Sequence, residues 1–409
     1  MDCAADCLDI VSLLMKSVVK STAWHLITSE YPPQIGGVSD YTYLVAGGLA
    51  ATGDEVHVWC PHSTQETPSL PGVTVHRELG QFDRNDLRHA GEMLNQFPSP
   101  RHLLVQWVPH GYGYNSMNFQ FCIWLWKRAA RARDHIDLMV HEPFLAFRDG
   151  SLKQDAAAFA HRLMTIILLR AARKVWVSIP NWEACLRPYS TGRRLPFSCL
   201  PVPSNVPVIH NASDGLRIRD RYAPEGGFLV GHFGTYGREV AKLLMNSLPS
   251  LLSGGSSKAV LLIGQGSERF RNSLIEKHPE LSELVQATGP LVAADVSRHL
   301  AACDLMFQPY PDGINGRHGS AMAGLAHGLP MVTTSGHLTE SFWIASGAAA
   351  IAAVRDPAIV ALVECLLKDP TERTRLGQAA AALYQERFDV RNTIAALRQD
   401  QRYLVENTG

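Results

Sequence analysis

The sequence contains two series of short, almost wholly apolar segments, and a stretch long enough for a helix separates each segment from the next. Strands that are apolar at nearly every position are typical of parallel sheets that helices cover on both faces. We therefore expect an α/β chain with two Rossmann-like, doubly wound domains. Ligands of such sheets bind beyond the carboxyl ends of the strands, so we expect the two domains to face each other across a cleft. The segments are WHLIT, EVHVW, VTVHR, HLLVQWV, DLMVHE and KVWVS in the first series and FLVGHFG, AVLLIGQG, LVQATG, DLMFQPY, PMVTT and AAAIAAV in the second.

The length of 409 residues agrees with two domains, because one core stops growing at about 250–300 residues. A proline-rich stretch over 200–227 has no sustained period and predicts a linker. We expect a helical extension over 1–20, a first domain over 21–205 and a second over 206–389. A last helix over 390–409 could pack back on the first domain.

Charge and cysteine usage limit the partners and the compartment. The net charge is zero and charged residues make up 19% of the chain, so we expect no nucleic acid partner. The eight cysteines form no C-x-x-C pair, which suits thiols in a reducing compartment. Residues 1–20 carry Asp2, Asp6 and Asp9 where an export signal would be positive, and no apolar run approaches a membrane span. We expect a cytoplasmic protein.

A glycine pair, Gly36 and Gly37, follows the first predicted strand and precedes a helical segment. Glycine lets a backbone approach a ligand without a Cβ in the way, and a helix N-terminus has unpaired N–H groups. The alternative is a tight turn without a ligand. The pair is not a dinucleotide fingerprint, because G-x-G-x-x-G is absent.

Several motifs in order resemble family 4 retaining glycosyltransferases of the GT-B fold, the glycosyl transferases group 1. They are EYPPQIGGVSDYTYLVAGGLAATGDEVHVW, LMVHEP, VGHFGTYG, LLIGQGSE, AACDLMFQPYPDG and LAHGLPMVTT. The resemblance covers roughly residues 22–400. It implies that the second domain binds a nucleotide sugar and the first an acceptor, and that transfer retains the anomeric configuration without a metal or another cofactor.

The sequence does not choose among UDP, GDP and ADP, although we favour a UDP-sugar as the donor. The acceptor stays open between a small molecule, a glycan and a lipid-linked sugar. Two other classes remain: a nucleotide-sugar 2-epimerase, which would need more carboxylates, and a non-catalytic nucleotide-sugar-binding relative.

Transfer of a sugar from a nucleotide diphosphate builds negative charge on the diphosphate, which amide groups and cations must meet. Arg317, Gly319 and Ser320 lie at the start of a small-residue helix and supply both, unless they form a simple turn with a solvated arginine. The further residues that we expect to bind the donor are Gly36, Gly37, Gly234, Thr235, Arg238, Gly264 and Leu291. We favour Arg238 over Lys242 as the side chain that contacts the phosphates.

Two residues are candidates for catalysis. By the resemblance, His141 contacts the donor sugar near the reacting centre; otherwise it is a structural, hydrogen-bonded histidine. The two glutamates of the family motif correspond to Asn315 and Ala323 here, so neither is acidic. Asp312, in YPDG, could replace the first of them.

The segment from Asn118 to His135 places an aromatic run before five basic residues, and its part Phe119–Arg133 could contact a membrane as an amphipathic helix. Its basic residues at helical spacing are Lys127, Arg128, Arg131, Arg133 and His135. The alternative is a crossover helix that packs on the core and has one basic face. No D-x-D, H-E-x-x-H, G-x-S-x-G or P-loop pattern suggests another chemistry, and we expect no metal site.

Overall fold

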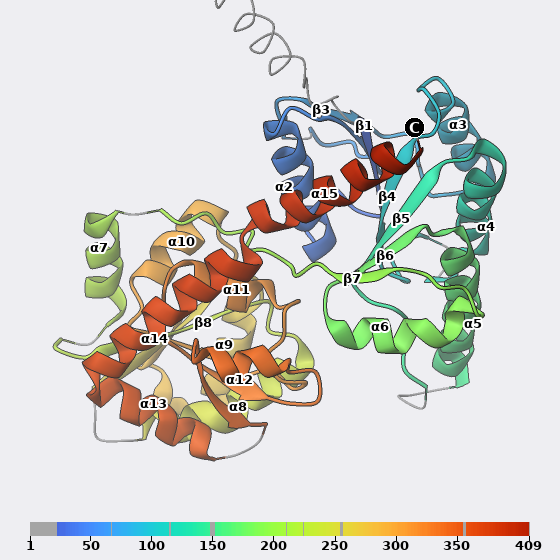
Figure 1. The fold of residues 1–409 in the computed structure, drawn as a ribbon. Coiled ribbons are helices and arrows are strands. Elements are labelled where there is room, and N and C mark those ends of the chain that lie inside the picture. The colour runs from blue at the N-terminus through green and yellow to red at the C-terminus, as the bar shows by residue number, and fades with distance from the viewer. Residues whose placement is uncertain are drawn as a thin grey trace, which may run out of the picture. The chain divides into compact units, whose positions relative to one another are not determined.

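The computed structural model describes residues 23–66, 68–113, 116–147, 152–209, 211–223, 225–253, 257–354 and 357–408. The predicted extension over 1–20 lies outside these residues. The described chain divides into two compact units, one with residues 23–177 and 182–198 and the other with 178–181 and 199–408 (Figure 1). Each unit is an α/β layer structure.

The first unit has a seven-stranded sheet in the order β3-β2-β1-β4-β5-β6-β7. The pairings from β3 through β6 are parallel, and Leu26 of β1 lies between Val58 and Leu104 on the neighbouring strands. The strands are β1 (Ala23–Thr28), β2 (Glu55–Trp59), β3 (Val73–His76), β4 (His102–Trp107), β5 (His135–Val140), β6 (Lys174–Val177) and β7 (Phe197–Cys199). The helices are α2 (Gly37–Ala51), α3 (Arg84–Leu94), α4 (Phe119–Lys127), α5 (Leu152–Ala171) and α6 (Pro180–Leu186), with short turns η2 (Arg128–Ala132) and η3 (Arg187–Ser190).

Local sequence explains where these helices begin. Helix α3 starts at a capping box, in which the Asp83 carboxylate accepts from the amide of Asp86 and Asp86 reaches back to the amide of Asp83. Helix α4 starts where the side chain of Asn118 accepts from the amide of Phe121. Both helices then bury aromatic and aliphatic side chains on the sheet.

The sequence suggested one exposed basic helical face around the end of α4. The structure does not expose all of these basic residues. Arg128 is buried, and its guanidinium binds the carboxylate of Asp134, which also accepts from Arg101. His135 begins strand β5. A buried carboxylate needs charged partners, so the fold takes Arg128 away from solvent and leaves Lys127, Arg131 and Arg133 exposed.

The second unit repeats the pattern with six parallel strands in the order β10-β9-β8-β11-β12-β13. The strands are β8 (Phe228–Phe233), β9 (Lys258–Ile263), β10 (Val285–Ala287), β11 (Leu305–Gln308), β12 (Met331–Ser335) and β13 (Ala350–Ala353). The helices are α7 (Ala212–Tyr222), α8 (Arg238–Leu252), α9 (Ser267–Lys277), α10 (Ala293–Ala301), α11 (Gly319–Ala326), α12 (Ser341–Ser346), α13 (Ala358–Lys368), α14 (Pro370–Leu383) and α15 (Val390–Thr408), with turns η4 (Pro279–Leu281) and η5 (Tyr384–Phe388).

The sheet of the second unit separates two hydrophobic clusters. Met306 and Phe307 are neighbours on β11, yet Met306 joins one cluster with Ile263 and Met331, while Phe307 joins the other. Successive side chains of a strand point to opposite faces, so burial of both requires helices on each face. This arrangement explains why the strands read as continuous apolar runs.

Two elements differ from the sequence-based expectation. The short strand β7 was not predicted, because only three residues pair there. The predicted linker contains an 11-residue helix, α7, which starts where Asn211 accepts from the amide of Asp214. Its charged residues pair with each other and with the unit rather than forming an apolar stripe, so no hydrophobic period marks it.

Candidate active site

The loops after β8 and β9 meet at the carboxyl edge of the second sheet, where the strands end. A Cβ added to Gly264, whose φ is 108°, would lie 2.6 Å from the carbonyl oxygen of Gly234. A Cβ at Gly266 would lie 3.1 Å from the carbonyl oxygen of Thr235. Glycine at these positions therefore lets two backbone segments pack together. The structure brings the predicted residues Gly234, Thr235 and Gly264 into one loop cluster.

Two other predicted donor residues lie apart from that cluster. Arg238 is the first residue of α8, and its side chain is 96% exposed, with Nε 3.8 Å from the nearest carboxylate oxygen of Glu239. Leu291 precedes α10 and packs, partly buried, on the hydrophobic cluster around Met306. The Arg238 side chain is therefore open to a ligand, whereas that of Leu291 is used in part for packing.

The loop between β11 and α11 holds the remaining predicted residues of the second unit. Asp312 and Arg317 form an ion pair, with 3.4 Å between Oδ2 and Nη2. Gly313 has a φ of 81°, and an added Cβ would overlap the amide of Gly336, so the loop packs tightly on the segment after β12. The Asp312 carboxylate is 40% exposed and the Arg317 side chain 24%. Both reach solvent while the backbone beneath them is fixed.

Aromatic packing supports the start of helix α11. The rings of Tyr310 and His318 stack with 3.8 Å between their centroids and an interplanar angle of 3°. The Tyr310 hydroxyl shares a hydrogen bond of 2.8 Å with the Ser320 hydroxyl. Helix α11 has no side-chain cap, and a Cβ added to Gly319 would meet nothing within 4 Å. Gly319, the first residue of α11, thus borders open space, as an anion site at this helix end requires.

The residues at the positions of the family's two glutamates, Asn315 and Ala323, have structural roles in this chain. The amide of Asn315 donates from Nδ2 to the carbonyl of Gly313 and accepts at Oδ1 from the amide of Arg317. Ala323 is fully buried in α11. A nearby carboxylate, Glu340, accepts from the amide of Gly316 and from Trp343, and burial raises its pKa.

Sequence reasoning did not find Tyr310, His318 or Glu340. Burial lowers the pKa of His318 to about 3, and its Nδ1 accepts from the amide of Asn315. Their spacing around the YPDG turn gave no signal, because each acts through backbone groups that fold together only in three dimensions.

In the first unit, His141 follows β5 and lies at the carboxyl edge of that sheet. Its Nε2–H donates to Gln106 Oε1 at 2.9 Å, and the edge of its ring packs on Tyr41. Burial lowers the pKa of His141 to about 3, so the imidazole is neutral at pH 7. Trp182 donates to its carbonyl and fixes the loop. Gln106 and Tyr41 were not predicted from the sequence.

The glycine pair before α2 has a different role from the one expected. The Glu30 carboxylate accepts from the amides of Val38 and Ser39 at 2.9 and 3.0 Å, so the first turn of α2 does not offer these amides unpaired. A Cβ added to Gly36 would lie 2.3 Å from Glu30 Oε1, whereas one added to Gly37 would meet nothing within 4 Å. Gly36 makes room for a carboxylate of the protein itself, and only Gly37 borders open space.

Comparison with known protein families identifies the domain that contains the loops of the second unit. Residues 227–369 match the model of the glycosyl transferases group 1. The chain carries a group 1 glycosyltransferase domain. The match includes β8, β9, the β11–α11 loop and the ion pair of Asp312 and Arg317. The predicted family and the predicted activity class, a glycosyltransferase, are confirmed at this level. No curated protein matches the chain.

Solved structures with the same fold cover nearly the whole chain. Sucrose-phosphate synthase from Thermosynechococcus elongatus is 16% identical, with a TM-score of 0.73 over 94% of this chain and 100% of its own. Anabaena HepE in complex with UDP-glucose is 15% identical, with a TM-score of 0.63 over 93% and 99%. WaaG, a glycosyltransferase involved in lipopolysaccharide biosynthesis, is 15% identical, with a TM-score of 0.63 over 92% and 98%. The predicted two-domain α/β fold of the group 1 glycosyltransferase is confirmed.

Proposed function

We propose that this glycosyltransferase belongs to family 4 and transfers a sugar from a UDP-sugar to an acceptor with retention of the anomeric configuration. One observation carries the proposal: within the matched domain, Gly319 at the uncapped start of α11 borders open space, and the cation Arg317 lies two residues before it. The sugar donor is the substrate, and no other cofactor is required. The complex of HepE with UDP-glucose supports the choice of uridine as the nucleoside of the donor.

The chemistry of the donor site follows from its charges. As the bond to the anomeric carbon breaks, negative charge grows on the diphosphate, and the α11 amides and Arg317 stabilise it. Among the described residues, no group of three or more histidine, cysteine, aspartate or glutamate side chains is placed to hold a metal ion. In the proposal, these amides and the guanidinium meet the charge without a metal. Asp312 accepts hydrogen bonds from hydroxyl groups of the donor sugar.

His141 contributes as a neutral group. With a pKa of about 3 it carries no proton to give as an imidazolium at pH 7. Its bond to Gln106 fixes the orientation of the ring. We propose that His141 hydrogen-bonds the donor sugar near the reacting centre, as the family resemblance implies, rather than acting as a general acid.

The test is a screen of UDP-, GDP- and ADP-sugars against small-molecule, glycan and lipid-linked acceptors, with release of the nucleoside diphosphate as the readout. We expect UDP release that rises with acceptor and persists in EDTA, and a product whose anomeric proton coupling matches that of the donor. Isomerised sugar would instead identify an epimerase, and binding of UDP-sugar without turnover a non-catalytic relative. Loss of release in EDTA would overturn metal independence.

A surface of the first unit bears on the acceptor. Helices α4 and α5 are neighbours, and both expose apolar side chains, including Trp126 at 43% and Phe159 at 58%. Ile123 and Leu163 lie one turn from these and are also exposed, while Lys127 and Arg131 follow at the end of α4. We propose that this face docks on an anionic membrane, since apolar area and cations together bind such surfaces. No helix in the described part of the chain is long and apolar enough to cross a membrane.

Vesicle sedimentation tests the docking surface. We expect the full chain to sediment with vesicles that contain phosphatidylglycerol and to stay in solution with pure phosphatidylcholine. Trp126→Gln with Phe159→Gln should abolish sedimentation, whereas Ile344→Gln, at a more exposed site on α12, should not. Equal sedimentation of the double variant and the control would refute the surface without affecting the donor proposal.

A further inference from the structure

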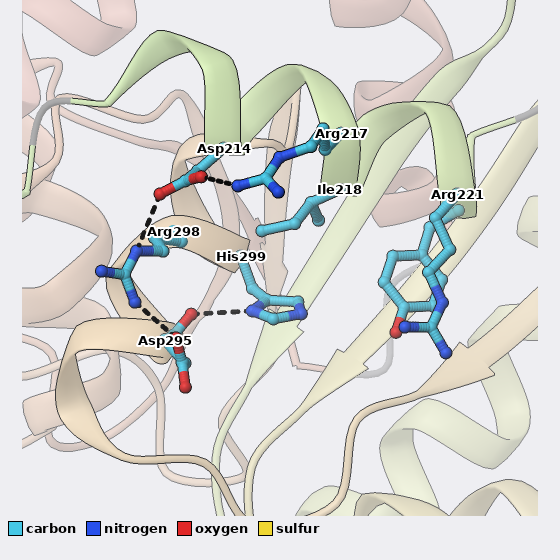
Figure 2. Close-up of a pocket in the computed structure, with 8 residues that line it drawn as sticks. Asp214, Arg217, Ile218, Arg221, Asp295, Arg298 and His299 are labelled. Atoms are coloured by element: carbon cyan, nitrogen blue, oxygen red, sulfur yellow. Dashed lines mark hydrogen bonds and ion pairs between the residues drawn. The ribbon is translucent and has the colours of Figure 1, made fainter.

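A pocket of about 540 Å³ lies between helices α7 and α10 of the second unit (Figure 2). The side chains that line it recur at helical spacing, so each helix turns one face to the pocket. They are Asp214, Arg217, Ile218, Arg221 and Tyr222 on α7 and Asp295, Arg298 and His299 on α10. The pocket contains none of the residues of the candidate active site.

The carboxylates of the pocket are already neutralised by two of its arginines. Asp214 pairs with Arg217 and also forms an ion pair with Arg298, whose Nε lies 3.1 Å from Oδ2. Asp295 accepts from the same guanidinium, with 2.5 Å between Oδ1 and Nη1. Figure 2 shows Arg298 between the two acidic side chains. This network leaves the remaining cation, Arg221, as the charge that a ligand would meet.

Arg221 is placed and oriented for an anion. Its guanidinium lies over the ring of Tyr222, with 5.0 Å from Cζ to the ring centroid, and it forms no ion pair with any residue that the structure describes. The ring of His299 lies 6.1 Å from that of Tyr222 between centroids, and its Nδ1 donates to the carbonyl of Asp295 at 2.7 Å, so the other ring nitrogen is left for a ligand. An arginine held on an aromatic ring keeps its N–H groups free for a phosphate.

The walls of the pocket add an apolar contact. Ile218 and Tyr222 are partly buried against the hydrophobic cluster around Met306, so their exposed surfaces are fixed in place. A ligand that fits this lining carries an anionic group for Arg221 and a flat or apolar group for Tyr222 and Ile218. Phosphate monoesters of small cyclic molecules have both.

The Arg221 end of the pocket is separate from the donor site. Arg219, two residues before Arg221, binds Asp304 and the carbonyl of Gly227, which precede strands β11 and β8. The end of α7 is therefore anchored at the amino edge of the sheet, whereas the donor loops follow the carboxyl ends. Strand β8 has six residues, which separates the two edges by roughly 17 Å.

We propose that the pocket between α7 and α10 is a second binding site, for a small phosphate monoester, with Arg221 as its anion contact. The site does not depend on the identity of the sugar donor or the acceptor. Calorimetric titration of the full chain with phenyl phosphate, at constant ionic strength, tests it. We expect saturable binding that is tighter than that of inorganic phosphate, because only the ester also contacts the apolar wall.

Three variants make the test specific. Arg221→Gln should weaken phenyl phosphate binding about tenfold or more, whereas Lys277→Gln, which removes an exposed charge at the end of α9, should change it less than about twofold. Asp214→Asn should leave binding intact or strengthen it, because it releases Arg217. Binding should persist in the presence of saturating UDP.

Any of three results would overturn the site. They are no saturable binding to the wild-type chain, equal losses for Arg221→Gln and Lys277→Gln, and displacement of phenyl phosphate by UDP. The melting temperature of Arg221→Gln should equal that of the wild type, which excludes unfolding as the cause of a loss.

Discussion

At the scale of single residues, the ion pair of Asp312 and Arg317 couples two different roles. Arg317→Ala should weaken UDP binding by roughly 10- to 150-fold, because a charge-assisted hydrogen bond contributes about 1.5–3 kcal/mol. Asp312→Asn removes a negative charge beside Arg317, so UDP should bind equally well or more tightly. The same change should lower turnover of the UDP-sugar, since the hydroxyl groups lose an anionic acceptor.

Calorimetry with UDP and with the intact donor separates these effects. Asparagine at position 312 keeps the size of the side chain. A loss of UDP affinity in that variant would therefore mean that Asp312 positions Arg317 rather than competing with the diphosphate for its guanidinium. Unchanged turnover of the sugar donor would leave Asp312 as a turn residue only.

The glycine pair gives a second prediction at this scale. Gly36→Ala would push the Glu30 carboxylate from the amides of α2, so both Gly36→Ala and Glu30→Ala should lower the free energy of unfolding by about 0.5–2 kcal/mol. The double variant should lose little more than either single variant, because both break the same contact. Gly37→Ala should leave stability near that of the wild type and reduce activity if a ligand lies against it. Additive losses in thermal melts would contradict a shared contact.

At the scale of elements, substitutions at the start of helix α11 can distinguish an effect on stability from an effect on UDP binding. Gly319→Asp places a negative charge at the uncapped start of the helix, where it should stabilise the fold by about 0.3–1 kcal/mol through the helix dipole. The same charge should repel a diphosphate and weaken UDP binding. Gly319→Ala is the control, because its Cβ meets open space and brings no charge. A variant with aspartate that melts higher and still binds UDP like the alanine control would place the diphosphate elsewhere.

The elements also show what the sequence could predict. Apolar runs located the strands of both sheets, except for the three-residue β7, because full burial leaves an unmistakable pattern. Helix α7 was hidden because ion pairs hold much of its face, and only Ile218 and Tyr222 pack, partly buried, on the core. The YPDG turn and Gly319 could be placed from their order in the chain. The contacts of Gly36 with Glu30, and of His318 with Tyr310, depend on backbone geometry that no spacing encodes.

At the scale of the whole molecule, buried histidines link the stability of both units to pH. Burial lowers the pKa of His25 and His141 in the first unit to about 3, and that of His76 to about 4. In the second unit it lowers the pKa of His232 to about 4 and that of His318 to about 3. Each is neutral in the folded chain at pH values where the unfolded chain takes up a proton.

The direction in which stability changes with pH follows from that difference in proton uptake. Above pH 6.5 neither state binds these protons, and stability is complete. As the pH falls from 6.5 towards 4, the unfolded state binds more protons, so each histidine removes about 1.4 kcal/mol of stability per pH unit. Domains are stable by only about 5–15 kcal/mol, so we expect acid unfolding to begin within about two pH units below 6.5 and the first unit, with more such histidines, to unfold first.

Circular dichroism and tryptophan fluorescence during acid titration measure this unfolding. His232→Gln should flatten the pH dependence of the second unit by about 1.4 kcal/mol per pH unit, whereas His89→Gln, on the exposed face of α3, should not. A stability that stays constant between pH 7 and 5 would show that these rings are protonated in the folded chain as readily as in the unfolded one.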